Sequence, residues 1–474
     1  MNTGFERQRV LIISHDLVSA RMAGPGIRYW ELARALAQAC DVTLAAPGEV
    51  PPANGVRTVA YQPGAAETIR ALAAQADVIM AYGYLLYEYP FLAEVGVPLV
   101  LDLYIPGPTE ALPLNAWRPL EWQEAQQQAD LALLGRIAAA GDFFLCASER
   151  QRDFWLGFLA ATGRLAPAIF AQDPGFRSLI DVVPFGLPPE PPTRTGPLYK
   201  GSRPEIAPDD RLLIWGGGVW DWLDPLTLIW ALSRVVALRP NVRCVFPGGQ
   251  HPWSERVPAM SMLQRAQDLS LELGLTDRFV FWGDWVPYAR RADYLLEADI
   301  GISLHLDSVE TRFAFRTRIL DYIWAGLPMV VSEGDVLAEV VAAHGLGHVV
   351  RCGDVDGVVE AILDLLDDPQ ARTRRRTAFA AVAAQYAWPR VAAPLLAFCR
   401  NPHLAPDKAR PRLTPYPTAD WSLELARAKG RVRELEDLVA AYRSGRFMRL
   451  MAWLAETRAR ITQGLRPGRG GSEP

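Results

Sequence analysis

The residues best suited to catalysis or ligand binding gather in one polar segment, residues 303–328. An apolar run predicts a buried strand at its start, and a helix ending at Ala-Gly-Leu-Pro closes it. His305 and Glu310 lie in the loop between the two, and Arg316 and Arg318 stand where the helix begins. A helix N-terminus offers unpaired N–H groups and a partial positive charge, and arginine forks bind phosphate oxygens. The segment therefore predicts a site for a phosphate-containing ligand.

The same helix carries two further candidates for ligand binding. Thr317 lies between the two arginines, and Asp321 lies about one turn further along. The carboxylate of Asp321 can accept hydrogen bonds from the hydroxyls of a ribose or another sugar. The alternative interpretation is a capped surface helix with solvated arginines, and a single histidine such as His305 is more often structural than catalytic. The density of polar residues at a strand end favours the binding site.

Glycine loops follow the first strand predicted in each half of the chain. Gly24 and Gly26 precede a helix from which Arg28 can reach an anion, and Gly217 and Gly218 form part of a second loop. Glycine lets backbone N–H groups approach an anion closely. The alternatives are a tight strand–helix turn for the glycines and a surface position for Arg28.

One more strand end carries an acidic candidate, Asp102. Its carboxylate can contact a sugar or an acceptor, whereas a turn cap is the alternative. Four tryptophans also lie near predicted strand ends, where they can stack on a base or a sugar or simply pack in the core. They are Trp220, Trp222, Trp253 and Trp285.

The elements that must position these residues follow from the hydrophobic pattern. Short apolar runs alternate with longer amphipathic segments, which predicts parallel sheets flanked by helices. We expect strands at 10–14, 42–46, 78–81, 99–103, 143–147, 211–215, 242–246, 279–282, 300–304, 329–331 and 348–350, and helices at 27–39 and 123–140. The fold class is therefore α/β, with two doubly wound Rossmann-like domains facing across a cleft.

Proline-rich stretches divide the chain, because proline interrupts helices and central strands. The predicted parts are a first domain at 1–186, a linker at 187–206, a second domain at 207–385, a helix crossing back to the first domain at 386–400, a second linker at 401–420, a helical extension at 421–464 and a disordered tail at 465–474. An apolar stripe at 423–442 is typical of a short coiled coil and would serve oligomerisation. The arginine-rich apolar face at 443–461 suits an anionic membrane surface, with packing on a partner as the alternative.

Composition limits the function classes. The net charge of −4 argues against a nucleic-acid-binding surface. None of the five cysteines forms a C-x-x-C pair, so we predict neither a metal site nor a redox motif. Sparse cysteines and a short polar N-terminus without a long apolar core favour the cytoplasm, and no apolar stretch is long enough to span a membrane.

The segment at 303–328 resembles the C-terminal signature of the family-four retaining glycosyltransferases, which have the GT-B fold. That signature contains a Glu, seven residues and a second Glu, followed by Ala-Gly-x-Pro. Here Asp321 replaces the second Glu, Phe313 stands in place of the first, and Glu310 lies three residues earlier. The string Glu-Thr-Arg-Phe-x-Phe-Arg-Thr-Arg-Ile-Leu-Asp-Tyr resembles that of a bacterial subgroup. Other segments agree in order: Pro184-Phe-Gly resembles the family's hinge, and Gly283-Asp-Trp-Val-Pro resembles its base-binding loop.

The resemblance implies a role for each matched position. Asp321 would hold the donor ribose, Glu310 would take the role of the first Glu, and Trp285 and Val286 would meet the base. The family also places an Arg and a Lys after the first strand of the second domain, whereas the loop Gly216-Gly-Gly-Val-Trp-Asp-Trp has no basic residue. Either Arg316 and Arg318 supply that charge or phosphate binding is impaired.

The implied activity is transfer of a sugar from a nucleotide diphosphate sugar to a glycan or a lipid-linked acceptor. Such a transferase would be metal-independent and retaining, would need no cofactor besides its donor substrate, and would serve cell-surface polysaccharide or glycolipid synthesis at the inner face of the cytoplasmic membrane. Two alternatives stay open. One is a catalytically impaired protein that acts in binding or scaffolding, and the other is a nucleotide-sugar epimerase on the same architecture.

Overall fold

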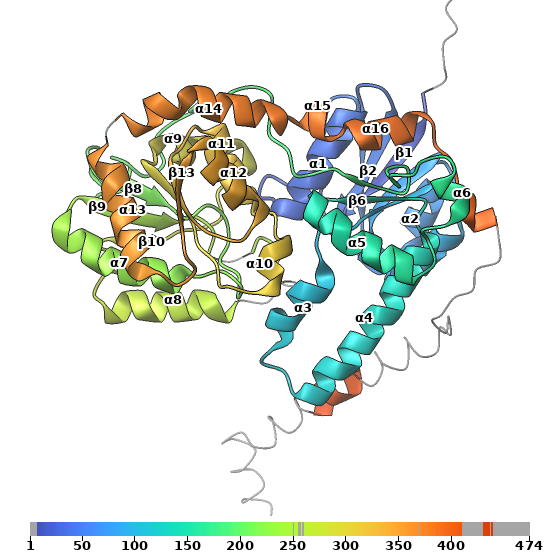
Figure 1. Cartoon of the computed structure of the whole chain (residues 1–474), viewed down its shortest axis with the longest axis horizontal. Coiled ribbons are helices and arrows are strands. Elements are labelled where there is room, and N and C mark those ends of the chain that lie inside the picture. The colour runs from blue at the N-terminus through green and yellow to red at the C-terminus, as the bar shows by residue number, and fades with distance from the viewer. Residues whose placement is uncertain are drawn as a thin grey trace, which may run out of the picture. The chain divides into compact units, whose positions relative to one another are not determined.

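The computed structural model describes residues 7–249, 251–254, 257, 260–368, 370–409, 430–436 and 438 of the 474-residue chain. The chain divides into two compact units. The larger unit comprises residues 1–115 and 133–417 and contains two β-sheets, and the smaller comprises residues 116–132 and 418–474 (Figure 1).

The first sheet has seven parallel strands in the order β3-β2-β1-β4-β5-β6-β7. They are β1 (Arg9–Ile13), β2 (Asp41–Pro47), β3 (Val56–Tyr61), β4 (Val78–Tyr82), β5 (Leu99–Asp102), β6 (Phe143–Cys146) and β7 (Ile180–Val182). Every residue of β5 and β6 is buried, because helices cover both faces of a parallel sheet. The chain order reverses at β1, which pairs with both β2 and β4. Ligands bind outside the carboxyl ends of strands at such a reversal.

Six helices and two short 3₁₀ turns belong to this half of the chain. They are α1 (Gly24–Leu36), α2 (Ala66–Ala73), α3 (Gly107–Asn115), α4 (Leu120–Ala140), α5 (Glu149–Ala161), α6 (Pro167–Phe170), η1 (Gly83–Leu86) and η2 (Pro90–Glu94). Ser148 caps α5, since its hydroxyl accepts a hydrogen bond from the backbone N–H of Gln151.

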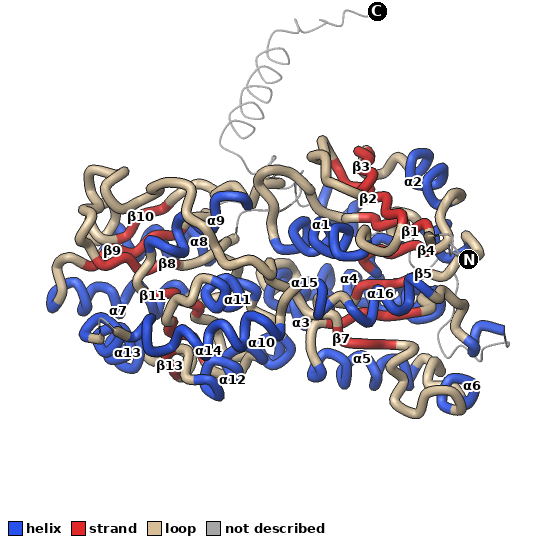
Figure 2. The backbone as a smooth tube through the Cα atoms, turned by 90° about the horizontal axis from the view of Figure 1, so that it is seen from above, coloured by secondary structure: helices blue, strands red, loops and turns tan. Residues whose placement is uncertain are grey.

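The second sheet has six strands in the order β10-β9-β8-β11-β12-β13. Its strands are β8 (Arg211–Ile214), β9 (Val242–Phe246), β10 (Val280–Trp282), β11 (Ile300–Ser303), β12 (Met329–Ser332) and β13 (Gly347–Val350). Its helices are α7 (Pro225–Leu238), α8 (Ser261–Glu272), α9 (Arg291–Glu297), α10 (Val309–Phe313), α11 (Thr317–Trp324), α12 (Val336–His344) and α13 (Val355–Asp367), with η3 (Tyr288–Arg290) before α9. Figure 2 shows the strands of the two sheets as two separate groups among their helices.

Two connections join the domains. One is the segment between β7 and β8, and the other is the helical run that Figure 1 shows passing from the second domain back to the first. The run consists of α14 (Ala371–Gln385), α15 (Trp388–Val391), α16 (Ala393–Arg400) and η4 (Pro406–Ala409). The two connections bond to each other, because Leu187 donates to Tyr386 and accepts from Trp388 through backbone groups, at 2.7 and 2.9 Å. A Cβ at Gly186 would lie 2.5 Å from the indole of Trp388, so this crossing requires glycine.

The smaller unit brings the first half of α4 together with residues 430–436. Arg118 forms an ion pair with Glu434 at 3.3 Å, and Arg433 donates to the backbone oxygen of Glu121 at 3.1 Å. The other residues predicted to form a coiled coil at 423–442, Leu438 excepted, lie outside the described part of the chain, as do the membrane-binding face at 443–461 and the tail at 465–474.

The predicted fold class is confirmed: two parallel sheets are flanked by helices in two Rossmann-like domains. Strands β3 and β7 were not predicted, because only the two end residues of β3 are buried and β7 has three residues. Helix α1 begins earlier than predicted, at Gly24, since Pro25 fits the first turn of a helix. Among the described residues, no helix combines the length and apolar character needed to cross a bilayer.

Candidate functional site

A cleft of about 570 Å³ lies between the two Rossmann-like domains. Its walls come from the segments that follow β1, β5 and β6 in the first domain and β8, β9, β10 and β11 in the second. The polar and glycine residues that line it include His15, Asp16, Gly24, Tyr104, Glu110, Gln151, Gly216, Gly217, Gly218, His251, Tyr288, Arg291, Glu310, Arg316, Thr317, Arg318 and Asp321. The cleft therefore lies at the carboxyl ends of both sheets, where the strand-order rule places ligands.

The glycine loop after β8 meets the guanidinium of Arg318. Its Nη2 donates to the backbone oxygen of Gly218 at 2.8 Å, and its Nη1 is buried without a hydrogen-bond partner among the described residues. Gly217 has a φ of +77°, which other residues rarely adopt. Burial lowers the pKa of Arg318 to about 10, so the side chain still carries its charge near neutral pH. A buried donor without a partner is costly, and an anion against this loop would satisfy it.

The first turn of α11 also faces the cleft. Thr317 is its first residue and lines the cleft, and no side chain caps this helix end. The free backbone N–H groups and the helix dipole therefore add positive potential beside Arg318. The loop, the arginine and the helix end together form a site whose chemistry suits a diphosphate.

Glu310 and Arg316 pair with each other across the loop between α10 and α11. The guanidinium donates two hydrogen bonds to the carboxylate, at 3.0 and 2.5 Å. Both residues line the cleft, yet their charges cancel locally. The predicted contacts of Glu310 with the sugar and of Arg316 with phosphate therefore compete with this ion pair.

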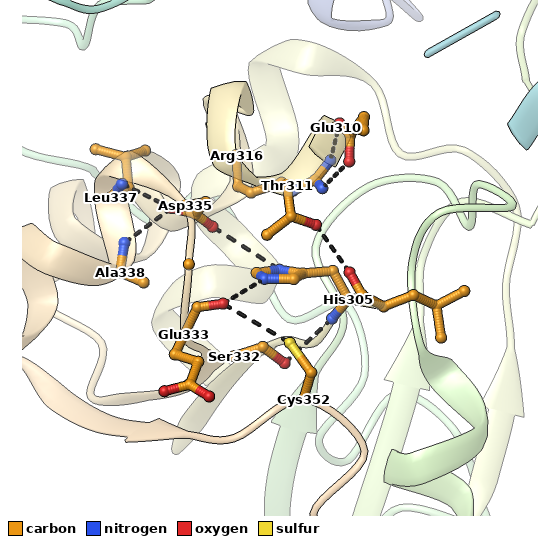
Figure 3. Close-up of polar contacts among 12 residues, drawn as sticks. His305, Glu310, Thr311, Arg316, Ser332, Glu333, Asp335, Leu337, Ala338 and Cys352 are labelled. Atoms are coloured by element: carbon orange, nitrogen blue, oxygen red, sulfur yellow. Dashed lines mark hydrogen bonds and ion pairs between the residues drawn. The ribbon is translucent and has the colours of Figure 1, made fainter. Parts of the chain in front are cut away.

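His305 lies among Thr311, Glu333 and Asp335 (Figure 3). It is not one of the residues that line the cleft. Its Nε2 lies 2.8 Å from the backbone oxygen of Glu333, and its backbone N–H donates to Ser332 Oγ at 3.2 Å. Because a carbonyl only accepts, Nε2 carries the proton, and Nδ1 faces Asp335 Oδ2 at 3.9 Å. Burial lowers the pKa of His305 to about 3, with a further contribution from Arg316. The predicted catalytic role of His305 is corrected to that of a buried residue that fixes the loop.

Asp321 reaches the cleft from the middle of α11. Its Oδ1 lies 3.4 Å from Arg291 Nε, and the Arg291 guanidinium stacks on the rings of Tyr288 and Trp324 at 3.9 and 4.4 Å. Burial raises the pKa of Asp321, and the charge of Arg291 opposes that shift. The carboxylate therefore faces the cleft beside a charged neighbour, and its oxygens can accept hydrogen bonds from hydroxyls.

The predicted base-binding loop lies on the same wall. Trp285 and Val286 line the cleft, and the indole N–H of Trp285 donates to the backbone oxygen of Met22 in the first domain at 3.0 Å. Gly24 lines the cleft at the start of α1. Gly26 does not, and a Cβ there would lie 2.1 Å from the backbone oxygen of Leu17. The predicted ligand contact at Gly26 is thus replaced by a packing requirement.

Arg28 and Asp102 also differ from the prediction. They form a buried bidentate ion pair at 2.7 and 3.1 Å, and Arg28 Nη1 donates to the backbone oxygen of Pro184. Neither side chain lines the cleft. Arg28 therefore has no free fork for an anion, and Asp102 serves as its counter-charge instead of meeting a sugar.

Several cleft residues were missed from the sequence. Asp16 and His251 approach each other from opposite domains, with 3.8 Å between Oδ2 and Nε2, and Arg291 and Glu110 bring charge to the two walls. Burial raises the pKa of Asp16 to about 6 and lowers that of His251 to about 4. Asp16 follows β1 and Glu110 follows β5, so the strand-end rule used for Asp102 could have found both.

Metal ligands do not gather in this part of the molecule. Within the described ranges, no group of three or more His, Cys, Asp or Glu residues is arranged to hold a metal ion. The chemistry that can be assigned to the site rests on arginines, a helix end and carboxylates.

Comparisons with known proteins agree with this geometry. Residues 210–368, which contain the glycine loop and the arginines, match the family model described as glycosyl transferases group 1. A comparison of the sequence with curated proteins finds no match. The second domain is thus similar to glycosyltransferases of group 1.

Solved structures show the fold over about four fifths of the chain. Sucrose-phosphate synthase from Thermosynechococcus elongatus aligns with a TM-score of 0.62 and 16% identity over 82% of this chain and 97% of that one. HepE from Anabaena, solved in complex with UDP-glucose, gives 0.55 and 15% over 82% and 98%. The α,α-trehalose 6-phosphate synthase from Burkholderia multivorans gives 0.55 and 12% over 83% and 97%. At these identities the likeness establishes the GT-B fold.

Proposed function

We propose that this protein is a glycosyltransferase that moves a sugar from a nucleotide diphosphate sugar to an acceptor. The observation that carries the proposal is the placement of Arg318. Its unpartnered Nη1 lies beside the glycine loop and the first turn of α11, in a cleft between two Rossmann-like domains. The match of residues 210–368 to group 1 glycosyltransferases supports the same activity.

The donor is proposed to carry uridine. HepE was solved with UDP and glucose and with UDP-glucose, and a trehalose-6-phosphate protein from E. coli was solved with UDP-2-fluoro glucose. In this chain the base would meet Trp285 and Val286, and the ribose hydroxyls would bind Asp321. The diphosphate would lie against Gly217 and Arg318.

The chemistry follows from that placement. The bond between the anomeric carbon and the diphosphate breaks, and the leaving oxygen gains negative charge. Arg318 and the N–H groups at Thr317 would stabilise this charge where it develops. We propose transfer with retention and without a metal ion or further cofactor, as the family-four resemblance implies.

The acceptor is proposed to be a glycan or a lipid-linked saccharide of cell-surface polysaccharide or glycolipid synthesis. The enzyme would then act in the cytoplasm at the inner face of the membrane, with 443–461 as the membrane contact and 423–442 as an oligomer contact. Flotation with anionic vesicles, comparing the full chain with one that ends at 420, measures the membrane contact. Equal flotation of the two proteins would argue against it.

A panel of nucleotides tests the donor. Thermal unfolding is measured with UDP, GDP, ADP and their glucose derivatives, because a ligand that binds only the folded state raises the melting temperature. We expect UDP and UDP-glucose to raise it and the others to raise it less. If none raises it, the diphosphate site is wrong.

The Glu310–Arg316 pair favours one alternative, a binding protein that has lost transfer. The Glu310 carboxylate is bound to Arg316 and so is not available to the donor sugar. The Arg316 guanidinium is bound to Glu310 and so is not available to the donor phosphates. Such a protein would bind UDP-glucose yet release no UDP from it. Release of UDP in a single-turnover assay would exclude this alternative, and release of an epimerised nucleotide sugar would favour the epimerase.

A further inference from the structure

The first domain places a second carboxyl group in the cleft, that of Glu110. It lies in the first turns of α3 and lines the cleft beside Tyr104 and Leu114. In the part of the chain that the structure describes, no hydrogen bond or ion pair reaches its carboxyl group. The mechanism proposed above gives this side chain no task.

The start of α3 is fixed by hydrogen bonds to the segment that precedes it. Thr109 Oγ1 donates to the backbone oxygen of Pro106 at 2.8 Å, and the backbone N–H of Gly107 donates to Ile105 at 2.8 Å. A Cβ at Gly107 would lie 2.2 Å from the hydroxyl of Tyr84, so the chain passes very close to that ring. Glu110 therefore lies on a helix whose start is fixed by these contacts.

The groups that face Glu110 come from both domains. Tyr104 belongs to its own domain, and its hydroxyl lies 3.5 Å from the backbone oxygen of Phe315 across the cleft. Glu310 and Arg316 face it from the second domain, where α10 packs against α3. Glu110 thus stands on the first-domain wall of the cleft, opposite the loop assigned to the donor sugar.

We propose that Glu110 is a catalytic residue that takes the proton of the acceptor hydroxyl during transfer. This inference rests on the proposed glycosyltransferase function. The O–H bond of the acceptor breaks and its proton passes to the Glu110 carboxylate. The acceptor oxygen forms a bond to the anomeric carbon on the face that the diphosphate leaves, so that the configuration is retained, and the bond to the diphosphate breaks with its electron pair on the leaving oxygen. No oxidant, reductant or metal is required.

The electrostatics of the cleft suit this role. Burial raises the pKa of Glu110 to about 8, with a further contribution from Glu310 that Arg316 opposes. An acid–base group works best when its pKa lies near the working pH. Since only the carboxylate accepts a proton, the rate is expected to rise with pH and to level off above about 8.

Glu110→Gln keeps the shape of the side chain and removes the base. The matched control is Glu67→Gln, because Glu67 also lies in the first turn of a first-domain helix but is exposed and away from the cleft. UDP binding is measured by calorimetry. The rate at which UDP is released from UDP-glucose, with water as the acceptor, is measured in buffers from about pH 6 to about pH 9.5. This range brackets the Glu110 pKa of about 8.

We expect Glu110→Gln to lower the rate by roughly 100-fold or more, as loss of a general base does. It should bind UDP as the wild type does and lose the pH-dependent rise, while Glu67→Gln behaves as wild type. An unchanged rate and pH profile would overturn the role of Glu110 and leave the donor site intact. Equal losses of UDP binding and rate would also overturn it, in favour of a structural role. A wild type that binds no UDP would instead refute the proposed donor, and this inference with it.

Discussion

Glu310 and Arg316 form a bidentate ion pair whose side chains are only 2% and 8% exposed. Glu310 comes from α10 and Arg316 immediately precedes α11, so the pair fixes the loop between two short helices. A buried charge that loses its partner is strongly destabilising, whereas replacing both charges by neutral groups costs much less. Removing either charge of this pair is therefore expected both to destabilise the loop and to change the charge in the cleft.

Arg316→Ala is expected to lower the free energy of unfolding by about 3–5 kcal/mol, because Glu310 is left buried and unpaired. The double variant Glu310→Gln with Arg316→Met should lie nearer the wild type. Urea denaturation of the three proteins measures this difference. A double variant as unstable as Arg316→Ala would show that packing, not charge, holds the loop.

Arg318→Ala should weaken UDP binding by roughly tenfold to a hundredfold, since a hydrogen bond to a charged group contributes about 1.5–3 kcal/mol. Arg318→Lys keeps a charge but loses the planar fork, so an intermediate affinity is expected. Arg312→Ala is the control, because Arg312 is exposed a few residues away. Calorimetric titration gives the three affinities, and equal affinities would remove Arg318 from the diphosphate site.

Asp102→Ala separates a structural from a catalytic role. It leaves the Arg28 charge buried, so we expect a loss of about 3–5 kcal/mol in stability, with UDP affinity of the folded protein unchanged. The control Asp356→Ala breaks an exposed pair with Arg234 and should cost about 0.5 kcal/mol or less. A stable Asp102→Ala protein that binds UDP but no longer releases it from UDP-glucose would restore the contact with the sugar or the acceptor expected from the sequence.

The fold could be predicted because the strands carry their own signal. Strands buried on both faces read as short apolar runs, and their strict alternation with helices leaves little choice of architecture. The two edge strands of the first sheet, β3 and β7, have no such run, which is why they were missed. The helix expected at 123–140 begins three residues earlier, at Leu120. Pro119 directly precedes it, and proline is favourable at the start of a helix.

Only those site residues that directly follow a strand could be predicted from the sequence. Gly217, Thr317, Arg318 and Asp321 follow strands of the second domain and do line the cleft, and their roles as ligand contacts stay predictions. Arg28 could not be placed in this way. Its partner Asp102 is 74 residues away in the chain, and such a pairing depends on how the elements pack rather than on local pattern.

Gln151 links the two walls of the cleft. Its Nε2 donates to the backbone oxygen of Phe313 at 2.9 Å, and its Oε1 accepts from the backbone N–H of Ala147. Gln151→Leu should therefore loosen the loop that carries Glu310, lowering the rate of UDP release from UDP-glucose several-fold with little change in UDP affinity. The exposed neighbour Asp153 provides the control as Asp153→Asn. Proportional losses of affinity and rate would place the effect in donor binding instead.

His15 gives the fold a predictable response to acid. It stacks on Tyr82 with 4.1 Å between ring centroids, and burial lowers its pKa to about 4 from an ordinary value of 6.5. The unfolded chain therefore takes up a proton at this residue below about pH 6.5, while the folded protein does so only near pH 4. The contribution of neutral His15 to the stability of the folded protein is therefore complete above pH 6.5 and is lost as the pH falls towards 4.

His15→Phe keeps an aromatic ring on Tyr82 and removes this titration. At about pH 7.5 we expect the melting temperature of the variant to equal or exceed that of the wild type. As the pH falls from 6.5 to 4, the gap, which is the melting temperature of the variant minus that of the wild type, is expected to grow. His403→Gln, at an exposed histidine, controls for the loss of a surface imidazole. Thermal unfolding across this range measures the gap. A gap that stays constant with pH would mean that His15 takes up its proton equally readily in the folded and unfolded states, and that burial beside the cleft does not affect it.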